Sequence, residues 1–163
     1  MIQLLRIMLL VVCILILALL INILASLLTP AHAADRQAVL DLARTVWAEA
    51  RGESAEGQRA VAHVVVNRVD AGFGRTVSEV VRQKHQFAPW TGAASRKRLM
   101  KLTDSTPGFI LAKAAAAIAL CRCSPDPTGG ALYFTNHRIR PAWSRHMSVI
   151  RIGNHAFYRG RAR

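Results

Sequence analysis

The longest hydrophobic stretch of the chain lies at its start, where residues 7–28 are apolar at all but two positions. Arg6 precedes this run, and the triplet A-H-A at 31–33 follows it. A basic start, an apolar core and a small-x-small site are together typical of a secretory signal peptide, here cleaved before Ala34. The run also has the roughly 20 residues that a helix needs to cross a bilayer, so an uncleaved membrane anchor is the alternative. Either reading predicts that residues 34–163 are exported.

Four later segments show the period of half-buried helices. The first covers 35–51 and is expected to end at Gly52. Ser54 is a good cap for a second helix that runs to about residue 70. Thr76-Val-Ser-Glu79 fits a capping box and predicts a short third helix to about residue 84.

The fourth helix is predicted from Thr106 and Pro107, which would supply a cap and a first-turn proline, to Leu120. Between the third and fourth helices, the stretch 85–91 contains a proline and two aromatic residues and is predicted to be a loop. A cationic cluster at 96–101 follows it.

After residue 125 the pattern changes to turn residues and β-prone runs at 131–135 and 148–152, with a further aromatic run at 155–158. These runs predict a small antiparallel hairpin or sheet packed on the helices. The expected fold class is therefore α+β, mainly helical, with a small antiparallel β element near the C-terminus.

The net charge of the chain limits the kinds of partner that it is expected to bind. The chain has 22 Lys and Arg against nine Asp and Glu, for a net charge of +13. Such an excess favours an anionic partner, and an exported protein meets wall polymers before nucleic acid, so no nucleic acid is expected. A non-catalytic cationic domain that binds the envelope through the clusters at 96–101 and 138–151 is one interpretation.

The cysteines and histidines give weak signals. Cys121 and Cys123 are one residue apart; we interpret them as structural residues, with a vicinal or intermolecular disulfide as the alternative. The six histidines form no H-E-x-x-H or other tight ligand pair, which disfavours a zinc amidase. Neither a metal nor another cofactor is expected.

Two carboxylates, Glu49 and Glu53, stand out in a chain that is poor in acids. The helical period places Glu49 at the edge of the buried stripe, where apolar neighbours such as Trp47 would raise its pKa and suit it to act as a general acid. Arg51 would oppose this if it came close; we expect it to pair with Glu53 instead. For Glu53 alone, capping of the next helix is the simpler interpretation. The other acids have turn, cap or surface explanations.

Five motifs in one order resemble the cell wall hydrolase family typified by the spore-cortex-lytic enzymes SleB and CwlJ. They are A-E-A-R-G-E (48–53), G-Q-R-A-V-A-H-V-V-V-N-R-V (57–69), Q-F (86–87), G-A-L-Y-F (130–134) and I-G-N-H-A-F-Y (152–158). The resemblance spans most of residues 34–163, which it marks as a cell wall hydrolase catalytic domain after a signal peptide or anchor at 1–33. No separate peptidoglycan-binding domain is recognisable.

The resemblance implies a lysozyme-like or lytic-transglycosylase-like domain that cleaves the bond between N-acetylmuramic acid and N-acetylglucosamine in peptidoglycan. It implies that Glu49, the first Glu of the E-A-R-G-E motif, is the catalytic acid. A lytic transglycosylase needs only this one carboxylate; if Glu53 is a second, the enzyme is instead a hydrolytic muramidase. A monomer is expected, with peptidoglycan glycan strands as partner and residues 7–28 as a membrane tether if they are not removed.

A glycan groove also needs flat apolar surfaces and amide or hydroxyl groups. Some of the candidates also match the family motifs, and core packing is the alternative for the aromatic ones. The predicted substrate-binding residues are Gln86, Phe87, Trp90, Tyr133, Asn136, Trp143 and His155.

Overall fold

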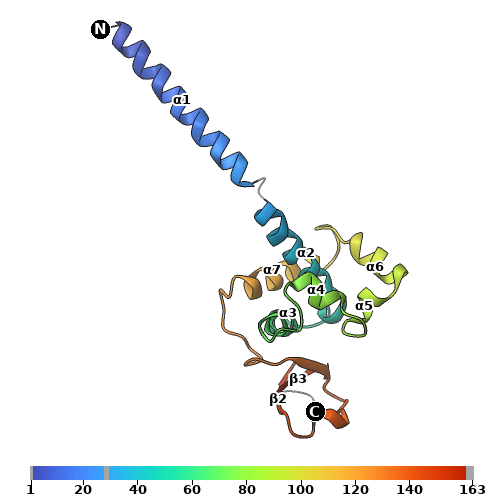
Figure 1. Ribbon diagram of the computed structural model, residues 1–163. Helices are drawn as coiled ribbons and strands as arrows, with labels where there is room; N and C mark the ends of the chain where they lie inside the picture. The colour runs from blue at the N-terminus through green and yellow to red at the C-terminus, as the bar shows by residue number, and fades with distance from the viewer. Residues whose placement is uncertain (1, 28–29, 161–163) are drawn as a thin grey trace. The chain divides into compact units, whose positions relative to one another are not determined.

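The computed structural model describes residues 2–27 and 30–160 (Figure 1). The chain divides into two compact units, Met1–Arg36 and Gln37–Arg163, and each is described by itself. In the first unit, α1 (Ile2–Leu27) contains a span, Arg6–Ala25, that is long and apolar enough to cross a membrane. An N-terminal signal sequence has the same properties, so both predictions for this segment stand. Residue 28, the end of the predicted apolar run, lies outside the described residues.

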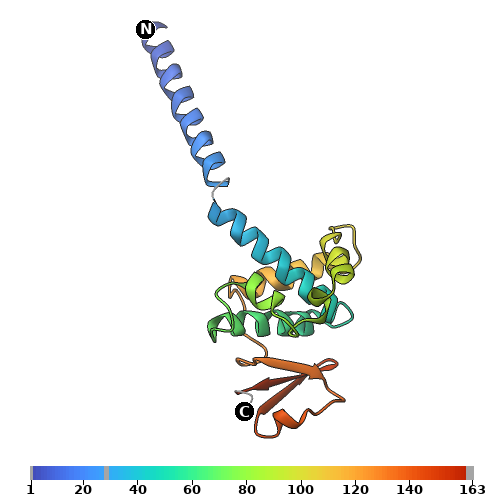
Figure 2. The ribbon, with the colours of Figure 1, turned by 45° about the vertical axis from the view of Figure 1, so that its right-hand side comes forward.

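The second unit is a helical body that carries a small sheet (Figures 1 and 2). Its first helix is the C-terminal part of α2 (Pro30–Ala50), which begins earlier than the sequence predicts. Helix α3 (Ala55–Asp70) packs against α7 (Phe109–Leu120) and α4 (Val77–Arg82) and also contacts the sheet. Three of its valines, Val61, Val64 and Val65, are fully buried, so α3 forms the centre of the hydrophobic core.

The predicted β element is a three-stranded antiparallel sheet. It consists of β1 (Tyr133–Asn136), β2 (Ser148–Ile152) and β3 (His155–Arg159), in the order β1-β3-β2. Phe157, in the central strand, belongs to the same hydrophobic core as α3. Residues alternate in direction along a strand, so Phe157 and His155 share the face toward the helices, whereas Ala156 and Tyr158 lie on the other face.

The caps predicted for α3 and α4 are confirmed. The Ser54 hydroxyl accepts a hydrogen bond from the Gly57 N–H (3.2 Å), and the Thr76 hydroxyl accepts one from the Glu79 N–H (3.1 Å). The predicted cap at Thr106 is wrong: its hydroxyl accepts from the Thr103 N–H, and α7 begins at Phe109 after Gly108. Gly108 has φ 76°, a conformation that glycine adopts without steric penalty.

The loop predicted at 85–91 is only partly correct. Its second half is a short helix, α5 (Ala88–Thr91), followed by α6 (Ala93–Met100), which contains most of the cationic cluster. Pro89 is compatible with α5 because it occupies the first turn, where a helix needs no N–H donor. Trp90 holds α5 in place, since its side chain is 5% exposed and its Nε1 donates to the Thr45 hydroxyl (2.9 Å).

Asp41 is a buried residue that joins two helices, although the sequence predicts an ordinary turn, cap or surface acid. Its carboxylate is fully buried and accepts hydrogen bonds from the Ser78 hydroxyl (2.7 Å) and Arg82 Nη2 (2.8 Å) in α4 and from Gln37 Nε2 (2.8 Å) in α2. A buried carboxylate is tolerated only when it is paired in this way. Asp41 therefore joins α2, the helix that carries Glu49, to α4.

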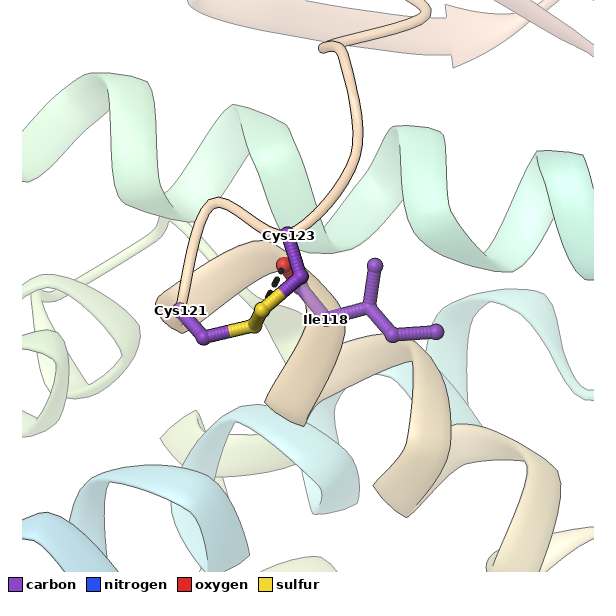
Figure 3. Close-up of a disulfide and its surroundings, with 3 residues drawn as sticks. All are labelled: Ile118, Cys121 and Cys123. Atoms are coloured by element: carbon purple, nitrogen blue, oxygen red, sulfur yellow. Dashed lines mark hydrogen bonds between the residues drawn. A yellow bond between two sulfur atoms is a disulfide. The ribbon is translucent and has the colours of Figure 1, made fainter.

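Cys121 and Cys123 form a disulfide just after α7, so the alternative left open for them holds (Figure 3). The Cys123 N–H donates to the Ile118 carbonyl (3.2 Å), and Arg122 between the cysteines has φ 54°. The Arg122 guanidinium binds both carboxylate oxygens of Asp70, at the end of α3 (2.7 and 2.8 Å). The disulfide thus holds the turn that follows α7, at the start of the segment that connects α7 to the sheet.

We expect the double variant Cys121→Ser, Cys123→Ser to be only modestly less stable than the wild type. The entropy that a disulfide removes from the unfolded chain grows with loop length, and a loop this short should contribute about 1.5 kcal/mol. Urea unfolding of both proteins under oxidising conditions measures the difference. A loss several times larger would show that the bridge stabilises contacts beyond its own turn.

Candidate active site

Glu49 lies in the last turn of α2 with its side chain half-buried. Among the described residues it has no hydrogen-bond or ion-pair partner. Burial raises the pKa of its carboxyl above the ordinary value of 4.5, in the direction that the sequence predicts. The site therefore holds an unpaired carboxyl group that retains its proton to higher pH than a solvated one.

The expected pair between Arg51 and Glu53 is wrong. The Arg51 guanidinium lies over the ring of Trp47, with its carbon 4.6 Å from the ring centroid. Trp47 is itself fixed, because its Nε1 donates to the Pro107 carbonyl (2.9 Å). Stacking on Trp47 gives the guanidinium a partner other than either glutamate.

Glu53 lies in the turn between α2 and α3 and reaches the turn between β2 and β3. Its Oε2 accepts from the Asn154 N–H (3.1 Å) and its Oε1 from Asn154 Nδ2 (3.0 Å). His155 Nδ1 lies 3.8 Å from Oε1, and the Glu53 side chain is only 9% exposed. Ser54, and not Glu53, provides the side-chain cap of α3.

Two glycines make room for Glu53. Gly153 has φ 56°, and a Cβ there would overlap Glu53 Oε2. A Cβ on Gly57 would lie 2.9 Å from Glu53 Cβ, closer than real Cβ contacts. The sequence G-N-H at 153–155 is thus a cradle for one carboxylate: Gly153 allows close approach, Asn154 donates both hydrogen bonds, and the His155 imidazole lies 3.8 Å away.

The environments of the two glutamates shift their pKa values in opposite directions. Burial acts to raise the pKa of Glu53, but the hydrogen bonds from Asn154 and the nearby imidazoles of His155 and His137 outweigh it and lower the pKa below 4.5. Relative to a solvated carboxyl, the ionised form is therefore favoured for Glu53 and the protonated form for Glu49. Titratable groups whose pKa values are pushed apart in this way are a mark of acid and base roles.

Because its folded pKa is lowered, Glu53 contributes stability that is present above about pH 4.5 and is lost as the pH falls through its folded pKa. We expect Asn154→Ala to flatten this acid limb, since it removes both hydrogen bonds that favour the carboxylate. Urea unfolding of the wild type and the variant between about pH 3 and pH 7, a range that includes the ordinary Glu pKa of 4.5, measures how the free energy of unfolding depends on pH. Parallel curves would contradict it.

Two of the predicted substrate-binding residues belong to the core instead. Phe87 is 1% exposed and Trp90 is 5% exposed, so neither ring offers a face to a sugar. The Phe87 ring packs near the Phe134 ring, and its centroid lies 5.1 Å from Cζ of the buried Arg68. Gln86, next to Phe87, is exposed.

The remaining predicted residues divide between the two faces of the sheet. Asn136 pairs with His155 across β1 and β3, on the face and at the end where Glu53 is bound. Tyr133 and Trp143 lie together on the other face, with ring centroids 5.4 Å apart. The structure therefore groups Glu53, Asn136 and His155 and separates them from the Tyr133 and Trp143 pair.

An open depression of about 320 Å³ flanks the end of α2. Trp47, Ala48 and Arg51 line one side, and Pro89, Arg98 and other residues of α5 and α6 line the other. Glu49 is not part of this lining; at 100° per residue it points about 200° around the helix from Trp47. Within the described ranges, no three His, Cys, Asp or Glu side chains converge to hold a metal ion.

Residues 52–158 match the family described as Cell Wall Hydrolase, and the chain belongs to this family. The match begins at Gly52, just after Glu49. Among its relatives, a spore cortex-lytic enzyme of Oceanobacillus iheyensis is 34% identical over 120 residues, covering 71% of this chain and 39% of that protein. The spore cortex-lytic enzyme of Bacillus cereus is 37% identical over 120 residues, covering 71% of this chain and 42% of the relative. The chain thus spans about two fifths of each relative's length.

Solved structures show the same fold. The catalytic domain of the germination-specific lytic transglycosylase SleB from Bacillus anthracis superposes with a TM-score of 0.59 at 33% identity, covering 75% of this chain and 93% of that domain. The catalytic domain of the Bacillus cereus SleB protein gives 0.60 at 34% identity, with 76% and 91% covered. The chain is therefore homologous to a lytic transglycosylase and shares its mainly helical domain with a small C-terminal antiparallel sheet.

Proposed function

We propose that the protein is an exported lytic transglycosylase that cleaves the bond between N-acetylmuramic acid and N-acetylglucosamine in peptidoglycan, with Glu49 as its acid and base. One observation carries the proposal: Glu49 is the unpaired, half-buried carboxyl, with a raised pKa, at the site. The homology to SleB supports the reaction class.

The state of Glu53 favours one catalytic carboxylate over two. A hydrolytic muramidase would use a second carboxylate to activate water or to attack the sugar. The Glu53 oxygens are already occupied by Asn154, and Gly153 packs directly against one of them. Glu53 is thus better suited to fix the α2–α3 turn to the sheet than to attack a substrate.

The reaction balances with Glu49 alone. The protonated carboxyl donates its proton to the glycosidic oxygen as the bond from that oxygen to C1 of muramic acid breaks, and the N-acetylglucosamine end leaves as an alcohol. The Glu49 carboxylate then takes the proton of the C6 hydroxyl as that oxygen bonds to C1, which forms a 1,6-anhydro end. Glu49 is left protonated, and no water is consumed.

The cellular location belongs to the same proposal. Helix α1 is suited to be a signal sequence or an inner-membrane tether, and either one delivers the domain to the envelope or periplasm. Without a tether, the surplus of positive charge would hold the enzyme near an anionic wall.

Mass spectrometry of peptidoglycan digested with the protein, beside the Glu49→Gln variant, tests the proposal. Anhydro-muropeptides from the wild type that are absent from the variant digest are the expected result. Reducing muramic acid ends would show that the reaction is hydrolysis and not transglycosylation, and Glu53 would then be the candidate for a second catalytic carboxylate. No cleavage by either protein would favour the non-catalytic envelope-binding domain.

A further inference from the structure

A second concave site lies on the face of the sheet that does not bind Glu53. It is a pocket of about 100 Å³ lined by the polar side chains of His137, Arg140, Arg151 and Tyr158 together with smaller apolar ones. The strand register places Arg151 opposite Ala156 and Val149 opposite Tyr158, so β2 and β3 form its floor. We call it the sheet pocket.

The sheet pocket lies in a part of the chain without acids. All nine Asp and Glu lie at or before Asp126, whereas residues 127–163 contain seven arginines. Among the residues that the structure describes, neither the Arg140 nor the Arg151 side chain has a hydrogen bond or an ion pair. Several cations of the helical body, by contrast, are paired with acids, as Arg82 is with Asp41. The two arginines at the sheet pocket are therefore not neutralised by ion pairs; Glu53, which acts on the pocket residue His137, is itself bonded to Asn154.

The lining indicates the kind of ligand. A guanidinium presents a planar pair of N–H donors that matches a carboxylate, and two such groups beside a small pocket form a receptor for a carboxylate at the end of a short side chain. Ile139 and Val149 supply apolar walls for the carbon atoms that carry it. Tyr158 is held in place because its hydroxyl donates to the Ile139 carbonyl (3.3 Å).

We propose that the sheet pocket binds a carboxylate of the peptide stems attached to muramic acid, so that the enzyme prefers glycan strands that still carry their peptides. The inference rests on the proposed function, because it takes peptidoglycan as the substrate. The bonds from Asn154 to Glu53 fix the sheet to the turn that follows Glu49. A glycan strand bound at Glu49 and a peptide bound in the sheet pocket would thus both contact the same compact unit, Gln37–Arg163.

Binding is measured with the full chain in detergent, carrying Glu49→Gln so that the polymer is not consumed. The two ligands are insoluble peptidoglycan freed of phosphate polymers and the same material after its carboxylates have been converted to amides. We expect Arg140→Gln with Arg151→Gln to weaken binding to the untreated peptide-bearing material about tenfold or more, as for the loss of a charge-assisted pair, and to leave binding to the amidated material unchanged. Arg140→Lys with Arg151→Lys, which keeps the charge, should lose most of the preference.

Arg75→Gln with Lys84→Gln is the matched control, since it removes the same charge from exposed positions of the helical body outside the cluster at 96–101; the Arg75 side chain is 94% exposed. An equal loss in this control, or an equal loss on both ligands, would overturn the proposal in favour of unspecific attraction. Binding that needs the phosphate polymers would overturn it too. Cleavage by proteins that retain Glu49 separates the two ideas: failure of the wild type on peptide-bearing peptidoglycan refutes the proposed function, whereas the binding data judge the sheet pocket alone.

Discussion

Replacing Glu49 with Gln is expected to reduce peptidoglycan cleavage by about 10²–10⁴-fold, the usual contribution of a positioned general acid. The amide keeps the size and most of the packing of the carboxyl but has no proton to donate to the glycosidic oxygen. Release of soluble muropeptides over time measures the rate. Glu56→Gln, the same change at an exposed position in the first turn of α3, is the control and should remain active.

Stability should change in the opposite direction to activity. Because the folded pKa of Glu49 is raised, its favourable contribution is present at low pH and is lost as the pH rises through the folded pKa. The neutral Gln does not suffer this loss, so we expect the Tm of Glu49→Gln at pH 7 to equal or exceed that of the wild type. An inactive variant with a clearly lower Tm would indicate a role in folding and would count against the proposed chemistry.

Gly153→Ala, in the turn between β2 and β3, is expected to be strongly destabilising. The new Cβ would overlap Glu53 Oε2, and alanine would have to adopt φ 56°. Left-handed strain and the loss of a buried carboxylate's hydrogen bonds should together cost about 2–4 kcal/mol of folding free energy. Gly52→Ala is the matched control: its Cβ would meet nothing within 4 Å, and the change should stay within about 0.5 kcal/mol.

A double-mutant cycle separates the two causes. In a Glu53→Ala background the overlapping oxygen is absent, so Gly153→Ala should there cost only the backbone strain of about 1–3 kcal/mol. Urea unfolding of the four proteins gives the coupling. If the two substitutions were simply additive, the cradle for Glu53 would not be the reason for glycine at 153.

The sequence predicts α3, α4 and β2 well because each carries a local signal. Ser54 and Thr76 are caps that act within their own first turn, and 148–152 is a short β-prone run that ends at a glycine. The stretch 85–100 lacks such a signal. Helix α5 exists because Trp90 is buried and bonded to Thr45, which is a tertiary cause that a local pattern does not contain.

The candidate site divides in the same way. The position of Glu49 at the edge of a buried stripe, and hence the direction of its pKa shift, follow from the helical period. The partner of Glu53 cannot be predicted from the helical period, because Asn154 is 101 residues away in the sequence. The only local sign of that turn is the sequence G-N-H. The sequence pattern does not predict the burial of Asp41 either, since its partners Ser78 and Arg82 lie in another helix.

The bonds between Glu53 and Asn154 also bear on how the domain assembles. A contact that closes a separation of 101 residues cannot form until the strands near the C-terminus are available, whereas α3 and its cap need only local sequence. In the export that we propose, the helical body can therefore begin to fold before the turn after Glu49 is bonded to the sheet. Under the proposed function, completion of the site late in folding would delay peptidoglycan cleavage until the chain has left the membrane.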